Sequence, residues 1–139
     1  MGFGIAHPDL LAGLFKIKDS YNIDAIATRV GAAAMRDQAY KNECIARVKR
    51  SRTILSEKLA NLGFTVPKYP RGNFLLVTPP AGDRTAADLK VDLEQRNILV
   101  RYFREPGLDD KLRITVGTDE QNQTLIESLD QILRVSKHT

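Results

Sequence analysis

The sequence has very few of the residues that build disulfides and metal centres. Cys44 is its single cysteine, so no disulfide can form within the chain and no cysteine cluster can bind a metal. The two histidines, His7 and His138, lie at opposite ends. We therefore expect neither a disulfide-stabilised domain nor a metal site.

Long hydrophobic runs are also missing. No apolar stretch approaches the roughly 20 residues that cross a bilayer. The opening residues MGFGIAHPDL have neither the basic flank nor the apolar core of a signal peptide, and Ala6 stands where N-myristoylation needs serine or threonine. We expect a soluble cytoplasmic chain with no membrane partner.

The 139 residues suffice for one ordinary domain with a modest core, and 42% of them are hydrophobic. The net charge is +4, and residues 41–58 hold six basic side chains against two acidic ones. A basic helix face can bind nucleic acid, but the stretch offers only Tyr40, at its edge, for base stacking. A solvated helix face is the simpler interpretation, and we expect no nucleic-acid partner.

Hydrophobic spacing in the first half of the chain is helical. It predicts a helix that starts at Pro8, a second over residues 23–34, and a long third helix that Asp37 caps and Gly63 ends. Residues 2–6, GFGIA, read as a short strand that has no neighbour in this scheme. That isolated strand suggests that a preceding sheet is missing.

After Gly63 the hydrophobic residues recur at every second position, which is the spacing expected of a strand. Residues 64–66 and 73–77 are predicted to be extended, and LRITV and the stretch NILVRYF to be strands. Thr85 with Asp88, and Thr118 with Gln121, have the spacing of capping boxes that begin helices.

The predicted fold class is α+β. A long helical spine is followed by a β-α-β-β-α small domain, whose mostly antiparallel sheet is covered by helices on one face. The final helix is expected to bury the residues Leu125, Ile126, Leu129, Ile132 and Leu133.

Common catalytic motifs are not found. There is no G-x-S-x-G and no serine near a histidine, and GFGIAH lacks the third glycine of a dinucleotide fingerprint. Asp109 and Asp110 fall in a predicted turn, where solvated carboxylates are the simpler interpretation.

Two arginines are more informative. In LRITV, alternation places Arg113 and Thr115 on one face, and in NILVRYF Arg101 shares its face with Leu99 and Phe103. A guanidinium held on a sheet suits bidentate binding of carboxylate or phosphate. Spacing alone nevertheless favours two ordinary surface arginines at sheet edges.

Longer strings of residues resemble a known family. PGLDDKLRITVGTDEQNQTLIESL is similar to the end of the histidinol-phosphate aminotransferases, pyridoxal-phosphate enzymes of the aspartate aminotransferase fold, and GFGIAHPDLLAGLFKIKDSYNIDAIA resembles their segment just beyond the cofactor lysine. GNFLLV and NILVRYF follow in the family's order, so that the resemblance covers essentially the whole chain.

The resemblance implies a set of substrate-binding residues. Arg113 matches the arginine that binds the substrate carboxylate, and Arg101 the arginine that helps hold a distal acid or phosphate. Asn73 matches an asparagine near the substrate. Tyr21 and Asn22 match a pair that flanks the cleft, although a serine precedes them where the family has proline.

The resemblance also implies what is lacking. The family's Schiff-base lysine, the aspartate on the pyridine nitrogen and the phosphate cradle all precede the GFG segment. We therefore expect residues 1–22 to be a remnant of the large cofactor domain and residues 23–139 to be the small C-terminal domain. No catalytic, cofactor-binding or metal residue is assigned, and the chain alone is expected neither to bind pyridoxal phosphate nor to transaminate.

The intact enzyme would be a homodimer that acts on an amino acid or a phosphorylated amine. Phosphothreonine decarboxylases share these motifs, so the substrate stays open. The alternative is a stand-alone binding or oligomerisation module, in which uncovered apolar helix faces are buried in a dimer or a partner protein.

Overall fold

The computed structural model describes residues 4–135. The chain divides into two compact units, residues 1–44 and residues 45–139. The domain boundary expected between residues 22 and 23 is not tested by this division and stays a prediction.

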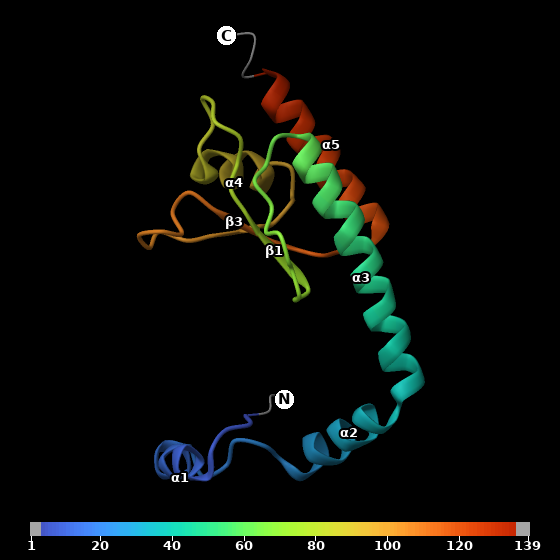
Figure 1. Ribbon diagram of the computed structural model, residues 1–139, viewed down its shortest axis with the longest axis vertical. Helices are drawn as coiled ribbons and strands as arrows, with labels where there is room; N and C mark the ends of the chain where they lie inside the picture. The colour runs from blue at the N-terminus through green and yellow to red at the C-terminus, as the bar shows by residue number, and fades with distance from the viewer. Residues whose placement is uncertain (1–3, 136–139) are drawn as a thin grey trace. The chain divides into compact units, whose positions relative to one another are not determined.

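The first unit holds helices α1 (Pro8–Ile17) and α2 (Ala25–Arg36) and the beginning of α3 (Gln38–Asn61) (Figure 1). Proline stands in the first turn of α1, and Asp24 Oδ1 accepts a 2.7 Å hydrogen bond from the Ala27 amide at the start of α2. Asp37 Oδ1 accepts from the Tyr40 amide at 3.1 Å, which confirms that Asp37 caps the long helix. Neither α1 nor α2 has a buried residue.

The prediction of a strand over residues 2–6 is wrong for residues 4–6, the part of this range that the structure describes. Residues 2 and 3 lie outside the described residues, and residues 4–6 form no strand. A strand needs a neighbour to pair its backbone groups, and residues 4–6 form no backbone hydrogen bond with another described residue.

The second unit is built on a three-stranded sheet of β1 (Phe74–Val77), β2 (Arg101–Tyr102) and β3 (Leu112–Thr115). β3 lies in the middle and pairs antiparallel with both neighbours, which agrees with the antiparallel sheet expected from the sequence. α4 (Ala86–Glu94) lies between β1 and β2 in the chain, and α5 (Asp119–Val135) follows β3. Of the helices within residues 4–135, none has the length and apolar character of a bilayer-spanning segment.

The hydrophobic core lies on one face of this sheet. Leu112 and Ile114 of β3 point into it, whereas Arg113 and Thr115 are exposed on the other face, as alternation predicted. Strand β1, Phe64 after α3, and helices α3, α4 and α5 contribute the rest of the core. Its buried members are Leu55, Leu59, Phe64, Leu75, Val77, Ala86, Leu89, Leu93, Leu112, Ile114, Leu125, Leu129 and Ile132.

Both predicted capping boxes are confirmed. Thr85 and Asp88 exchange side-chain to backbone hydrogen bonds at the start of α4. Thr118 and Gln121 do the same before α5, at 2.9 and 3.2 Å. These reciprocal bonds satisfy amides that have no partner inside the helix.

The two other extended segments are shorter than predicted. Of residues 64–66, only Thr65 forms a bridge, to Thr78. The strand expected over residues 97–103 is reduced to β2, and Asn97, with φ +60°, lies in the turn that follows α4.

Candidate functional site

The two arginines singled out in the sequence lie opposite each other on adjacent strands of the sheet. Arg101 and Arg113 are directly paired in the β2–β3 register, and both are exposed on the face opposite the core. Like charges at opposed positions destabilise a sheet. Among residues 4–135 neither guanidinium has a carboxylate partner.

Aromatic rings contact both guanidinium groups. The Arg113 Cζ atom lies 5.3 Å from the Phe74 ring centre and 6.0 Å from that of Phe103. The Arg101 Cζ atom lies 5.5 Å from the same Phe103 ring. Phe103 therefore touches both cations, and such contacts contribute about 0.5–1 kcal/mol each at exposed sites.

This arrangement can bind an anion. Each guanidinium presents several N–H donors in one plane, which matches the oxygens of a carboxylate or phosphate. The positive charge is concentrated because no carboxylate in residues 4–135 forms an ion pair with either guanidinium. The rings restrict the side chains, so less conformational entropy is lost when an anion binds.

Asn73 lies immediately before β1, which is an edge strand of the sheet. Its carbonyl accepts a 2.9 Å hydrogen bond from the Val116 amide, and its exposed side chain has no partner among the described residues. Next to it, the Gly72 carbonyl accepts a 2.7 Å hydrogen bond from Arg52 Nη1. A Cβ at Gly72 would lie 3.3 Å from the Phe74 ring. Arg52 and Gly72 thus support this edge, and neither was predicted, because side-chain contacts between distant segments leave no periodic signal.

Tyr21 and Asn22 lie in the first unit, between α1 and α2. The side chain of Tyr21 is 98% exposed, and Asn22 Oδ1 accepts a 3.4 Å hydrogen bond from Lys18 Nζ. The two residues belong to a different unit from the arginines, so their role beside the same ligand stays a prediction.

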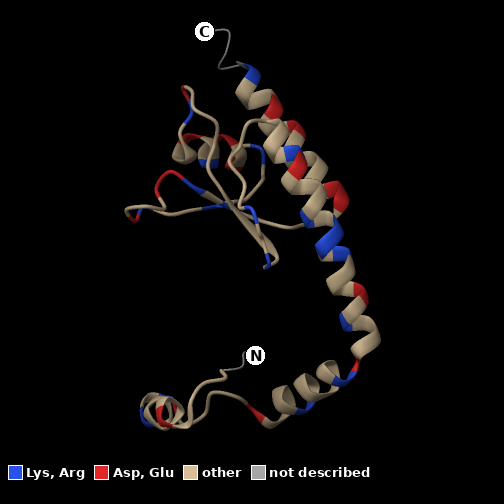
Figure 2. Ribbon diagram, in the orientation of Figure 1, with Lys and Arg blue, Asp and Glu red and all other residues tan. Residues whose placement is uncertain are grey.

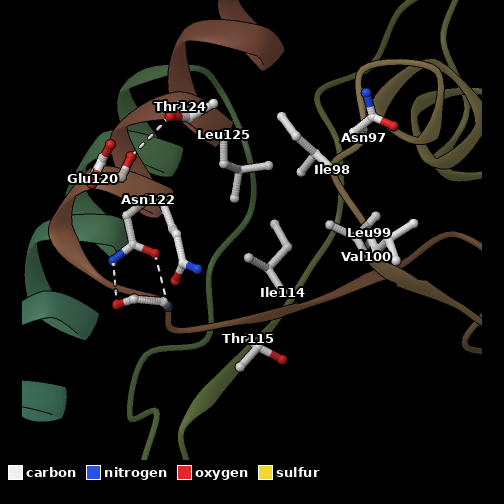
Figure 3. A pocket seen from close by; sticks show the side chains of 12 residues that line it. Asn97, Ile98, Leu99, Val100, Ile114, Thr115, Glu120, Asn122, Thr124 and Leu125 are labelled. Carbon is white, nitrogen blue, oxygen red and sulfur yellow. Dashed lines mark hydrogen bonds between the residues drawn. The ribbon is translucent and has the colours of Figure 1, made fainter.

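A groove of about 600 Å³ was not predicted. It lies between residues 97–100, the end of β3 and the first half of α5, and Figure 3 shows Ile98, Ile114 and Leu125 around it. On its α5 side, Asn122 bonds both backbone groups of Gly117, at 3.0 and 3.2 Å. None of the predicted site residues lines this groove.

The basic stretch of residues 41–58 does not form one free charged face. Arg50 Nη2 lies 3.4 Å from a carboxylate oxygen of Asp119, and Lys58 Nζ donates to the Gln123 side chain, both on α5. In Figure 2 the ribbon of α3 carries both blue segments, for lysine and arginine, and red ones, for acidic residues. No group of three or more histidine, cysteine, aspartate or glutamate residues within residues 4–135 is placed to hold a metal ion.

Comparison with known proteins places the chain in a family. The family model of the class I and II aminotransferases matches residues 1–129. Histidinol-phosphate aminotransferase 1 from Trichormus variabilis is 58% identical over 134 residues, and the match covers 96% of this chain and 37% of the relative. Histidinol-phosphate aminotransferase from Syntrophotalea carbinolica is 40% identical and is likewise covered to 37%.

Solved structures show the same fold. The histidinol-phosphate aminotransferase from Clostridium acetobutylicum superposes with a TM-score of 0.78 at 22% identity, over 91% of this chain and 38% of that one. The L-threonine-O-3-phosphate decarboxylase from Porphyromonas gingivalis gives a TM-score of 0.71 at 28% identity, over 94% and 40%. The chain spans little more than a third of the length of such relatives. The match over residues 1–129 shows that the chain belongs to the class I and II aminotransferases.

Proposed function

We propose that this chain is the part of a histidinol-phosphate aminotransferase-like enzyme that binds the acidic groups of the substrate. Arg113 binds a carboxylate, and Arg101 holds a distal acid or phosphate group. Asn73, Tyr21 and Asn22 complete the contacts. The observation that carries the proposal is the opposed arginine pair, which has aromatic contacts but no carboxylate partner among the described residues.

The family implies pyridoxal phosphate, and one solved relative, from Sinorhizobium meliloti, is in complex with it. When bound, that cofactor supplies the electron sink for amino-group transfer. A lysine that forms a Schiff base needs surroundings that lower its pKa, such as burial in an apolar pocket. None of the lysines within residues 4–135 is buried. These residues therefore do not fit the cofactor by themselves, and we assign them only binding and orientation of substrate.

Orientation is itself a contribution to catalysis. Two guanidinium groups on neighbouring strands can fix an acidic substrate at two points, which lowers the entropic part of the barrier. Loss of one bidentate contact removes charged hydrogen bonds that contribute about 1.5–3 kcal/mol each.

A chimeric enzyme tests the proposal. This chain would replace the corresponding segment of the Trichormus variabilis relative, with which it is 58% identical. We expect the chimera to exchange the amino group between histidinol phosphate, whose one acid group is the phosphate, and a carboxylate-bearing amino acid. Arg113→Lys should lower kcat/KM for the amino acid, and Arg101→Lys should lower kcat/KM for histidinol phosphate, each by about 10–100-fold. Arg104→Lys, at an exposed position next to Phe103, is the matched control and should change kcat/KM less than twofold. Full activity in Arg113→Lys would refute the assignment.

A second experiment addresses the cofactor. The chain mixed with pyridoxal phosphate and borohydride is expected to yield no stoichiometric adduct on a specific lysine, because no described lysine is buried. Such an adduct would show that the chain holds the cofactor unaided.

An alternative function is supported by the exposed apolar side chains of the first unit. Phe15, Ile17 and Ile26 are 66%, 79% and 77% exposed. A stand-alone binding or oligomerisation module would bury them against a second copy or another protein. Light scattering after size-exclusion chromatography tests self-association, which a monomer at all concentrations would contradict.

A further inference from the structure

We propose that the groove between α3 and residues 67–71 is a second anion site, which takes a phosphate group carried by a small molecule or free in solution. The groove has a volume of about 380 Å³ and is largely open to solvent. That volume is at the lower end of the range for small-molecule sites. Its lining residues are Arg52, Thr53, Ser56 and Glu57 of α3, and Pro67, Lys68, Tyr69, Pro70 and Arg71.

The charge of the groove is positive and unbalanced. Arg52, Lys68 and Arg71 line it against one carboxylate, that of Glu57. No ion pair joins any of these four groups to another described residue. Cations from two segments are thus held around one hollow, and a phosphate dianion would offset their mutual repulsion.

Two of the cations are held in place by uncharged groups. Arg52 donates to the Gly72 carbonyl, which uses one N–H and leaves the rest of its planar fork available. Lys68 Nζ lies 5.4 Å from the ring centre of Tyr69. Neither contact neutralises the positive charge of the side chain that makes it.

Ser56 supplies a hydroxyl that lacks a partner. Its Oγ atom is inaccessible to solvent and makes no hydrogen bond. Helical Thr53 and Thr124 instead donate back to the carbonyls of Lys49 and Glu120, at 3.2 and 3.0 Å. An unsatisfied buried hydroxyl is costly, and rotation about one side-chain bond can aim this donor at an oxygen in the groove.

The site is separate from the opposed arginines. Its lining includes neither Arg101 nor Arg113, and the inference does not depend on the function proposed for that pair. Tetrahedral phosphate suits the groove because its oxygens can accept from the Arg52 fork, the two other cations and the Ser56 hydroxyl together.

The test is a titration of the full chain with sodium phosphate at pH 7.5, followed in ¹H–¹⁵N NMR spectra, with sodium chloride at matched ionic strength as the reference. We expect saturable shifts of the backbone amides of Arg52, Ser56 and residues 68–71. Removing two charges with Lys68→Gln and Arg71→Gln should weaken the binding about 25-fold. Arg29→Gln, an exposed charge change on α2, and Arg113→Gln should leave it unchanged.

Four outcomes would overturn the site: shifts that chloride reproduces, shifts that do not saturate, binding that survives the double variant, or loss of the shifts in Arg113→Gln. If Arg113→Gln alone abolishes the shifts, the phosphate binds at the sheet face and the groove is excluded. A parallel titration with phenyl phosphate distinguishes the source of the anion. Tighter binding than that of inorganic phosphate assigns an ester, and equal binding assigns the free ion; either supports the phosphate site.

Discussion

At the scale of single residues, the arginine pair shows how the chain keeps an unfavourable arrangement. Arg101 and Arg113 oppose each other on adjacent strands, where like charges cost stability. The contacts with Phe74 and Phe103 compensate in part. Within residues 4–135 no carboxylate pairs with either guanidinium, so the remaining repulsion is not offset by an ion pair.

Phe103 is predicted to couple the two guanidinium groups. Phe103→Leu keeps an apolar side chain but removes the ring that lies 5.5 Å from Arg101 and 6.0 Å from Arg113. We expect faster side-chain motion of both arginines in ¹⁵Nε relaxation measurements, because each loses a cation–π contact. Phe74→Leu is the matched variant and should loosen Arg113 alone. Equal mobility of Arg101 in wild type and Phe103→Leu would contradict the coupling.

At the scale of the elements, helices α3 and α4 end in the same way with different residues. After α3 the Gly63 amide donates to Ala60 and the Phe64 amide to Leu59, at 2.9 and 3.0 Å. After α4, Asn97 and Ile98 make the equivalent bonds to Glu94 and Leu93, both at 2.9 Å. In each case the residue with positive φ, Gly63 at 89° or Asn97 at 60°, reverses the chain and brings the next side chain back to the core.

Gly63→Ala is predicted to destabilise the second unit. A Cβ there would force an L-residue into the left-handed region and would lie 3.1 Å from Pro80 Cβ. We expect the free energy of unfolding in urea to fall by about 1–2 kcal/mol. Gly82→Ala has open space around the new methyl group and should cause no loss. Equal stability of the two variants would argue against strain at Gly63.

The capping box of α4 predicts an acid dependence of stability. A hydrogen bond from the Thr85 side chain holds the pKa of Asp88 below its ordinary value. A lowered folded-state pKa adds stability that is present above about pH 4 and is lost as the pH falls through the folded pKa. Asp88→Asn should therefore flatten the loss of stability below pH 4, as measured by urea unfolding at several pH values. An unchanged acid slope would show that the carboxylate is not the titrating group.

The elements that the sequence predicted well are those set by local chemistry. The helix starts at Asp37, Thr85 and Thr118 and the end at Gly63 follow from caps within a few residues of one another. The arginine face of β3 follows from strict alternation. The short extent of β2 and the Phe103 contacts depend on how distant segments pack, and that information is not contained in any one stretch of sequence.

At the scale of the whole molecule, the two units differ in what stabilises them. Residues 45–139 contain all the buried hydrophobic residues of the described part of the chain. Helices α1 and α2 have 10 and 12 residues and no buried side chain. Isolated helices of that length are marginal in water, since most helical stability in proteins comes from packing of an apolar face.

Amide hydrogen exchange is therefore expected to be fast in the first unit and slow in the core of the second. In the monomer, amides of α1 and α2 should exchange at nearly the rates of an unfolded peptide, because their opening costs almost no buried surface. Amides of β1 and β3 and of the Leu125–Ile132 part of α5 should be protected up to the global free energy of unfolding. Repeating the exchange measurement at higher protein concentration tests whether a second copy of the chain covers α1 and α2. Protection of α1 and α2 that grows with concentration would mean that a second copy covers their apolar side chains, and protection that is strong at every concentration would contradict the division into one stabilised unit and one marginal unit.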